Sequence, residues 1–142
     1  MAHKMSKKSA ASFWFEGDIK QCALGNELYR RVVFTGSHSQ LVVMNISKGE
    51  KTEEEPKDAD AFVFITKGKG KSVLENRSRD VGKHDLVFVP AGKVHSLLNS
   101  SHRGLKAIVV YSPPVFAEGE IQKTRDELSP GKKLALERAW EQ

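Results

Sequence analysis

The stretch VFVPAGKVHSLLNS, residues 87–100, joins two short apolar runs through a Pro-Ala-Gly sequence, and a histidine, His95, stands near the start of the second run. Proline and glycine in this arrangement are typical of a tight turn between two strands. Successive side chains of a strand point to opposite faces, so the second run can direct His95 and Leu97 toward one face. The stretch therefore predicts two adjoining strands and a histidine aimed at the interior of a β-structure.

Short β-rich runs separated by turn residues continue on both sides of this stretch. The predicted strands are residues 29–34, 39–46, 61–66, 71–76, 77–81, 85–89, 94–99 and 105–112. No helical crossover separates them, so we expect an antiparallel sandwich or barrel. Residues 50–60 are acidic and contain Pro56, which predicts a loop or a ragged edge strand.

The two ends of the chain differ from this β-region. Residues 1–12 contain three lysines and no acidic residue, and we interpret them as a disordered N-terminal arm. Residues 13–116 form the predicted β-domain, and residues 117–142 form a tail. Ser129 and Pro130 are typical of a helix start, so the tail is expected to contain a C-terminal α-helix. That helix would dock on the domain or contribute to a dimer contact.

The residues around His95 resemble the second sequence motif of the cupins, P-x-G-x-x-H-x-x-x-N. The matching positions are Pro90, Gly92, His95 and Asn99. The motif expects a glycine six positions before Pro90, where this chain has His84. Residues 35–41, TGSHSQL, resemble small single-domain cupins described as mannose-6-phosphate isomerase-like. The resemblance implies an all-β fold, a small antiparallel β-barrel or jelly roll of the RmlC-like type.

The first cupin motif matches in spacing but lacks its metal ligands. Gly49 and Gly68 stand where its end glycines belong, and counting back from Gly68 puts its Glu/Gln position on Ala61. Its His-x-His pair falls on residues 54–56, Glu-Glu-Pro, or one position later on residues 55–57, Glu-Pro-Lys. Divalent transition metals in such sites need three or four nitrogen or oxygen ligands, so the resemblance implies a degenerate metal motif and no cofactor.

Five residues remain as candidates for ligand binding: His95, Asn99, Glu54, His38 and Gln40. If a divalent transition metal were bound, its ligands would be His95, Glu54 and His38. On a strand, His38 and Gln40 share a face that is less apolar than the opposite face, so we expect both to point outward or to line a polar mouth. The alternative for His95 is a barrel-lining histidine satisfied by hydrogen bonds.

Charge and composition restrict the partners. The net charge is +5, but residues 13–116 contain 15 basic and 12 acidic groups that are interspersed, so nucleic-acid binding is not expected. No apolar run approaches the roughly 20 residues of a membrane helix. A single cysteine, Cys22, and the lack of a secretory signal favour the cytoplasm, and a mitochondrial location stays open.

These observations favour a metal-poor cupin that binds a small polar ligand, or a protein partner, inside or at the mouth of the barrel without robust catalysis. The alternative is a metal-dependent enzyme of the sugar-phosphate isomerase-like or dioxygenase-like kind, which would use His95 with non-standard ligands. The resemblance also implies a homodimer formed through edge strands, with residues 32–34 and 13–15 as contributors.

Overall fold

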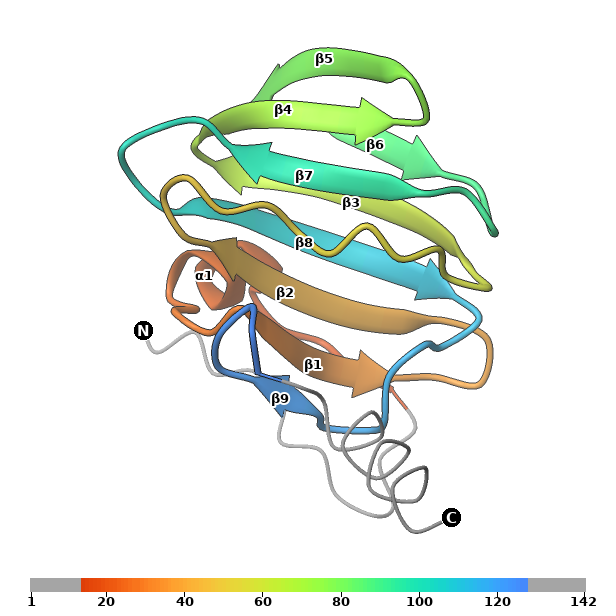
Figure 1. The fold of residues 1–142 in the computed structure, drawn as a ribbon. Coiled ribbons are helices and arrows are strands. Elements are labelled where there is room, and N and C mark those ends of the chain that lie inside the picture. Colours follow the sequence, from red (N-terminus) through yellow and green to blue (C-terminus); the bar gives the residue numbers. More distant parts are fainter. Residues whose placement is uncertain (1–13, 128–142) are drawn as a thin grey trace, which may run out of the picture.

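The computed structural model describes residues 14–127, which form two facing antiparallel sheets (Figure 1). The strands are β1 (Arg30–Thr35), β2 (Gln40–Ile46), β3 (Asp60–Lys67), β4 (Lys69–Leu74), β5 (Arg77–Gly82), β6 (Leu86–Val89), β7 (His95–Asn99), β8 (Leu105–Ser112) and β9 (Ile121–Gln122). The larger sheet has the order β6-β3-β8-β2-β1-β9, and the smaller sheet has the order β5-β4-β7. The expected all-β jelly roll is confirmed, although no ladder between described residues joins the two sheets into a closed barrel.

Two elements were not predicted from the sequence. The short helix α1 (Ile19–Leu24) begins at Asp18, whose carboxylate accepts a hydrogen bond from the backbone N–H of Gln21 at 3.0 Å. Strand β9 pairs with the start of β1, so the larger sheet continues beyond residue 116. The expected N-terminal arm (residues 1–12) and C-terminal helix lie outside the described residues.

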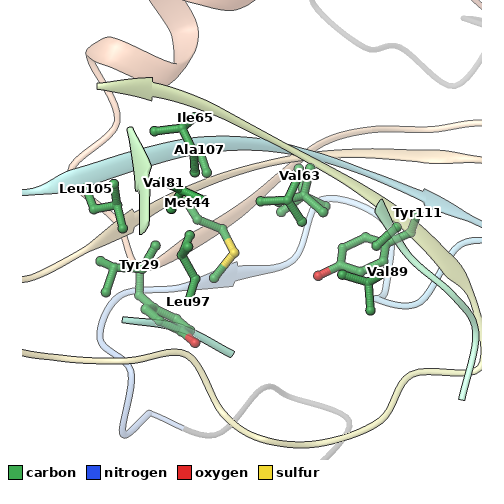
Figure 2. Packing of buried hydrophobic residues seen from close by; sticks show 14 of the residues in the cluster. Tyr29, Met44, Val63, Ile65, Val81, Val89, Leu97, Leu105, Ala107 and Tyr111 are labelled. Atoms are coloured by element: carbon green, nitrogen blue, oxygen red, sulfur yellow. The ribbon is translucent and has the colours of Figure 1, made fainter. Parts of the chain in front are cut away.

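The main hydrophobic core lies between the two sheets (Figure 2). Strand β2 contributes Val42, Met44 and Ile46 to this core. Its opposite face is also buried, because Val43 packs against Cys22 and Ala23 of α1. Both faces of β2 are therefore covered, and the apolar side that sequence reasoning took for the interior is the side beneath α1.

Gln40 consequently points inward, which corrects the expectation that it faces outward or lines a polar mouth. Its side chain is 1% exposed. Its amide nitrogen donates to Thr35 Oγ1 at 2.9 Å and to the backbone oxygen of Phe116 at 2.8 Å, and its oxygen accepts from the backbone N–H groups of Val115 and Phe116. Gln40 thus anchors the segment after β8 and has a structural role.

The connection between β2 and β3, residues 47–59, runs across the gap between the sheets. Its first half lies beside β7: Gly49 donates to the backbone oxygen of Asn99 at 3.1 Å, and Thr52 donates to that of Leu97 at 3.0 Å. Beyond Thr52 it has no regular secondary structure until β3 begins. Figure 1 shows this β2–β3 connection passing across β8, between β7 and β2.

The Pro-Ala-Gly turn forms as the sequence predicts. Gly92 has a φ of 81°, a backbone conformation that glycine adopts without strain, and its N–H donates to the backbone oxygen of Lys57 at 2.8 Å. The turn before β6 is also present, with His84 in place of the expected glycine. His84 has a φ of 76°, which is unfavourable for a residue that carries a Cβ atom.

The residues that the structure exposes on its outer surface are the ones that a homodimer interface could use. Val32 is buried in the main core and is not available as an interface residue, which corrects part of the expectation for residues 32–34. The larger sheet instead exposes Phe62 of β3 and Phe88 of β6, whose ring centroids lie 5.0 Å apart, and Leu86 beside them is 58% exposed. Within residues 14–127, no helix is long and apolar enough to cross a membrane.

Candidate functional site

A cavity of about 70 Å³ is lined by residues of both sheets and of the second half of the β2–β3 connection. Its apolar wall consists of Met44, Ala59, Ala61, Val63, Val89, Pro90, Leu97, Ala107 and Val109. Its polar lining consists of Arg30, Thr52, Glu53, Glu55, Lys57, Lys93, His95 and Tyr111. Figure 2 shows Val89 and Tyr111 near one end of the core and Val63 between them and the other labelled residues.

His95 lines this cavity from the first position of β7. Its Nε2 atom lies 2.9 Å from the Oγ atom of Ser72 on the neighbouring strand β4. Burial disfavours the charged imidazolium and lowers the pKa of His95 below its usual value of 6.5. The ring is therefore neutral at pH 7, and its Nδ1 atom makes no hydrogen bond to a residue between 14 and 127.

Arg30, which also lines the cavity, forms a largely buried cluster with Tyr29 and Glu53. Arg30 is 4% exposed, and its guanidinium Nη2 is bonded to Glu53 Oε1. The other carboxylate oxygen, Oε2, accepts a hydrogen bond from the Tyr29 hydroxyl. Nη1 of Arg30 donates to Gln122 Oε1 of β9 at 2.7 Å, and the guanidinium lies 4.3 Å from the ring centroid of Phe116. The two oxygens of Glu53 are thus held by two different donors.

This cluster keeps Glu53 ionised. Burial raises the pKa of its carboxyl group, but the Arg30 guanidinium and the hydrogen bonds from Tyr29 and Arg30 outweigh burial and lower the pKa to about 2. Burial and the neighbouring Glu53 carboxylate raise the pKa of the Tyr29 hydroxyl, so Tyr29 stays protonated and acts as a donor. The cavity therefore contains a fixed carboxylate and a fixed cation at neutral pH.

The residues that line the cavity alternate along the β2–β3 connection and into β3. Glu53, Glu55, Lys57, Ala59, Ala61 and Val63 all line it. Glu54 and Pro56 between them are exposed, and Glu54 pairs with Lys51. Of the two possible alignments, the one that puts the His-x-His pair of the first motif on residues 55–57 matches the lining, and Glu54 does not line the cavity. The connection is extended here, so a shift of one residue exchanges the two faces.

The remaining sequence-predicted residues lie away from the cavity. His38 is exposed in the turn between β1 and β2. Asn99 lies on the same face of β7 as His95 but is fully buried, donates to the backbone oxygens of Ile46 and Arg103, and accepts from Ser101. Neither residue lines the cavity, so the structure does not bring His95, Asn99 and His38 together.

The residues present do not fit a divalent transition metal. Among residues 14–127, no three or more His, Cys, Asp or Glu side chains are grouped closely enough to hold one. His95 is the single imidazole in the lining, Glu53 is bound by Arg30 and Tyr29, and Lys57 and Ala61 stand at positions where a cupin metal ligand is expected. Fewer than three suitable donors therefore converge.

Sequence reasoning missed Arg30, Tyr29 and Glu53 as members of the site. One signal was available: Arg30 and Arg31 are adjacent on a predicted strand, so one of the two had to face inward. Glu53 gave no such signal, because it stands in a run of three glutamates that reads as a solvated loop.

Comparison with known proteins agrees with this architecture. A model of the cupin domain matches residues 42–111. The uncharacterized protein L612 of Acanthamoeba polyphaga mimivirus is 36% identical over 116 residues, which are 76% of this chain and 71% of that protein. The uncharacterized protein YrkC of Bacillus subtilis (strain 168) is 30% identical over 120 residues, 78% of this chain and 63% of that protein.

Solved structures agree as well. The crystal structure of BH2720 from Bacillus halodurans superposes with a TM-score of 0.74 at 27% identity, and the match covers 76% of this chain and 87% of that one. Fold, second motif and relatives lead to the same assignment: this chain belongs to the cupin family.

Proposed function

We propose that this chain binds a small organic ligand in the cavity between its sheets and that it does so without a metal centre. The observation that carries the proposal is the neutral imidazole of His95, which Ser72 holds by one ring nitrogen and which lines a cavity with a largely apolar wall. A neutral imidazole with one unused nitrogen offers a ligand a single directional hydrogen bond.

The rest of the lining supports a ligand with an apolar body. Ala61, Val63 and Val109 supply aliphatic surface and no polar side-chain atoms. Small-molecule sites usually combine such a wall with a few fixed polar groups. The volume of about 70 Å³ restricts the enclosed part of the ligand to a short group, and the open side allows the remainder to protrude.

The metal-dependent alternative would require a different donor set. A cupin metal site takes three or four nitrogen or oxygen ligands, and here Ala61 and Lys57 line the cavity together with His95. Elemental analysis of the purified protein addresses this point directly. We expect less than a tenth of an equivalent of Mn, Fe, Ni or Zn per chain, and near-stoichiometric metal that is lost on His95→Ala would refute the proposal.

Binding is tested by titrating the ¹⁵N-labelled protein with a panel of short alcohols, amides and carboxylates. Ligands of the proposed class should shift the amide signals of His95, Ala61 and Val109. The variant His95→Ala should lose binding, and the matched variant His38→Ala should retain it, because His38 is exposed away from the cavity. A panel in which no compound moves the cavity signals would overturn the proposal.

A further inference from the structure

Tyr29 and Arg30 together form a binding site for one carboxylate. The Tyr29 hydroxyl binds one oxygen of Glu53 and the Arg30 guanidinium binds the other. A guanidinium and a phenol hydroxyl that grip the two oxygens of one carboxylate select for its charge and its planar shape. Lys57 Nζ, 3.9 Å from Glu53 Oε1, adds further positive charge on the cavity side.

The two donors are held in place by regular structure. Arg30 is on β1 and is bonded to Gln122 of β9. Its guanidinium lies 5.0 Å from the ring centroid of Tyr29 and 4.3 Å from that of Phe116. Its Nε atom is buried and has no hydrogen-bond partner among residues 14–127. The cation is thus fixed in position, but the Glu53 carboxylate and Gln122 do not use all of its donors.

The carboxylate between them belongs to a segment without regular secondary structure. Glu53 follows Thr52, the last residue of the β2–β3 connection that bonds to β7, and the next residues have no regular secondary structure. Its side chain is 21% exposed and lines the cavity. An incoming carboxylate would replace one anion with another of the same charge and shape, and Glu53 would regain water.

We propose that Glu53 is a built-in occupant of a carboxylate site and that the ligand of this cavity is a short-chain organic carboxylate, which takes the place of Glu53 on Tyr29 and Arg30. The inference rests on the proposed function, because it assigns the polar group of that ligand. The apolar tail would lie along Val63 and Val109, and the residues that follow Glu53 would move outward when the ligand enters.

Because Glu53 is part of the chain, it competes with the ligand intramolecularly. A group on a short flexible segment has an effective concentration in the millimolar range, so it competes as a free anion at a millimolar concentration would. The wild-type protein should therefore bind a minimal carboxylate weakly, and removal of the Glu53 carboxylate should strengthen binding at least tenfold.

The test uses propionate as the probe and propionamide as its neutral control of equal size. Both are titrated into ¹⁵N-labelled wild-type protein, Glu53→Ala and Glu54→Ala, with the side-chain Nε–H signal of Arg30 as the local reporter. Propionate should shift this signal in the wild type and bind Glu53→Ala at least tenfold more tightly. Glu54→Ala should behave as the wild type, because the neighbouring Glu54 pairs with Lys51 outside the cavity.

A second measurement keeps the inference testable if Glu53→Ala does not fold. In wild-type protein saturated with propionate, exchange of the Gly92 amide, which donates to the backbone oxygen of Lys57, should accelerate, because Glu53 no longer anchors the segment. Unchanged exchange at saturation, or equal affinity of the wild type and Glu53→Ala, would overturn the inference.

The neutral probe separates this inference from the proposed function. Propionamide that shifts His95 and Ala61 as strongly as propionate does would leave ligand binding intact and remove the carboxylate assignment. If neither probe shifts His95 or Arg30, the carboxylate inference is overturned, and the wider panel decides the proposed function.

Discussion

The Nε2 atom of His95 on β7 lies 2.9 Å from the Oγ atom of Ser72 on β4. This bond ties the imidazole to the smaller sheet, whereas most of the apolar cavity wall comes from the larger sheet. The orientation of the ring is therefore set by a neighbour on the same sheet and does not require a metal. A histidine fixed in this way is satisfied in part and still offers its second nitrogen to the cavity.

The lowered pKa of His95 predicts a dependence of stability on pH. The folded state binds a proton at His95 less readily than the unfolded state, whose pKa is near 6.5. The free energy of unfolding should therefore fall as the pH drops below about 6.5 and level off below the folded pKa. Urea unfolding from pH 8 to pH 5 measures this. His95→Gln should reduce the dependence of the unfolding free energy on pH. The control variant His38→Gln, at an exposed site, should reduce it less. An equal dependence in the two variants would contradict the prediction.

Glu53 should contribute to stability in a different pH range. Its pKa is about 2 in the folded protein against a usual 4.5, so its stabilisation is complete above pH 4.5 and is lost as the pH falls toward 2. Glu53→Gln should cost about 2 kcal/mol at pH 7, less than a fully buried pair because the side chain is partly exposed. The difference from wild type should shrink between about pH 5 and pH 2. A difference that is constant over this range would show that the ion pair is not its cause.

His84→Gly should stabilise the fold. The φ of 76° at His84 costs a residue with a Cβ atom about 1 kcal/mol or more, and glycine avoids this cost. The greater freedom of glycine in the unfolded chain and the loss of the stacked contact with Phe64 reduce the gain to about 0.5 kcal/mol. Urea denaturation measures the change. His38→Gly in the other exposed turn, where φ is not positive, should instead destabilise; stabilisation by both variants would point to a different cause.

The alternation along the β2–β3 connection predicts which substitutions create a metal site. Glu55→His, Lys57→His and Ala61→Gln together would place three donors beside His95, and this triple variant should bind Ni²⁺ or Mn²⁺ in the micromolar range by titration calorimetry. Pro56→His with Ala61→Gln should bind no better than wild type, because residue 56 is exposed. Tighter binding by the Pro56 variant would mean that the lining residues are assigned one position off.

The homodimer expected from sequence stays a prediction, and the exposed aromatic pair indicates where to test it. Contiguous exposed apolar side chains are typical of association surfaces, and Phe62, Phe88 and Leu86 form such a group on the outer face of β3 and β6. Sedimentation at micromolar concentration should show a dimer, and Phe62→Ser with Phe88→Ser should shift it to the 15.8 kDa monomer. A wild-type monomer would remove the prediction, and a dimer that the double variant leaves intact would place the interface elsewhere.

Local patterns predicted much of the fold. Period-two alternation and turn residues indicated the strands, the Pro-Ala-Gly turn and the inward position of His95, because each depends on residues close in sequence. Counting back from Gly68 along the first motif also placed Ala61 among the inward-facing residues. The sequence did not predict that α1 covers the outer face of β2, and the expected orientation of Gln40 was wrong for that reason.

The polar residues of the site are held by partners that are distant in the sequence. Arg30 is hydrogen-bonded to Glu53, 23 residues away, and to Gln122, 92 residues away. No local pattern reports such pairings. Among three consecutive glutamates the chemistry is identical, so only the three-dimensional path of the backbone decides that Glu53 and Glu55 line the cavity and Glu54 does not.

That path has a consequence for how such a pocket can diversify. Three of the ionisable lining residues, Glu53, Glu55 and Lys57, come from a stretch without regular secondary structure, so their inward orientation is not fixed by strand pairing on both sides. Deleting or inserting one residue between Thr52 and Asp60 would exchange the inward and outward sets, bringing Glu54 and Pro56 to the cavity while the nine strands stay in place. Two chains with nearly the same sequence and fold can therefore present pockets with different linings.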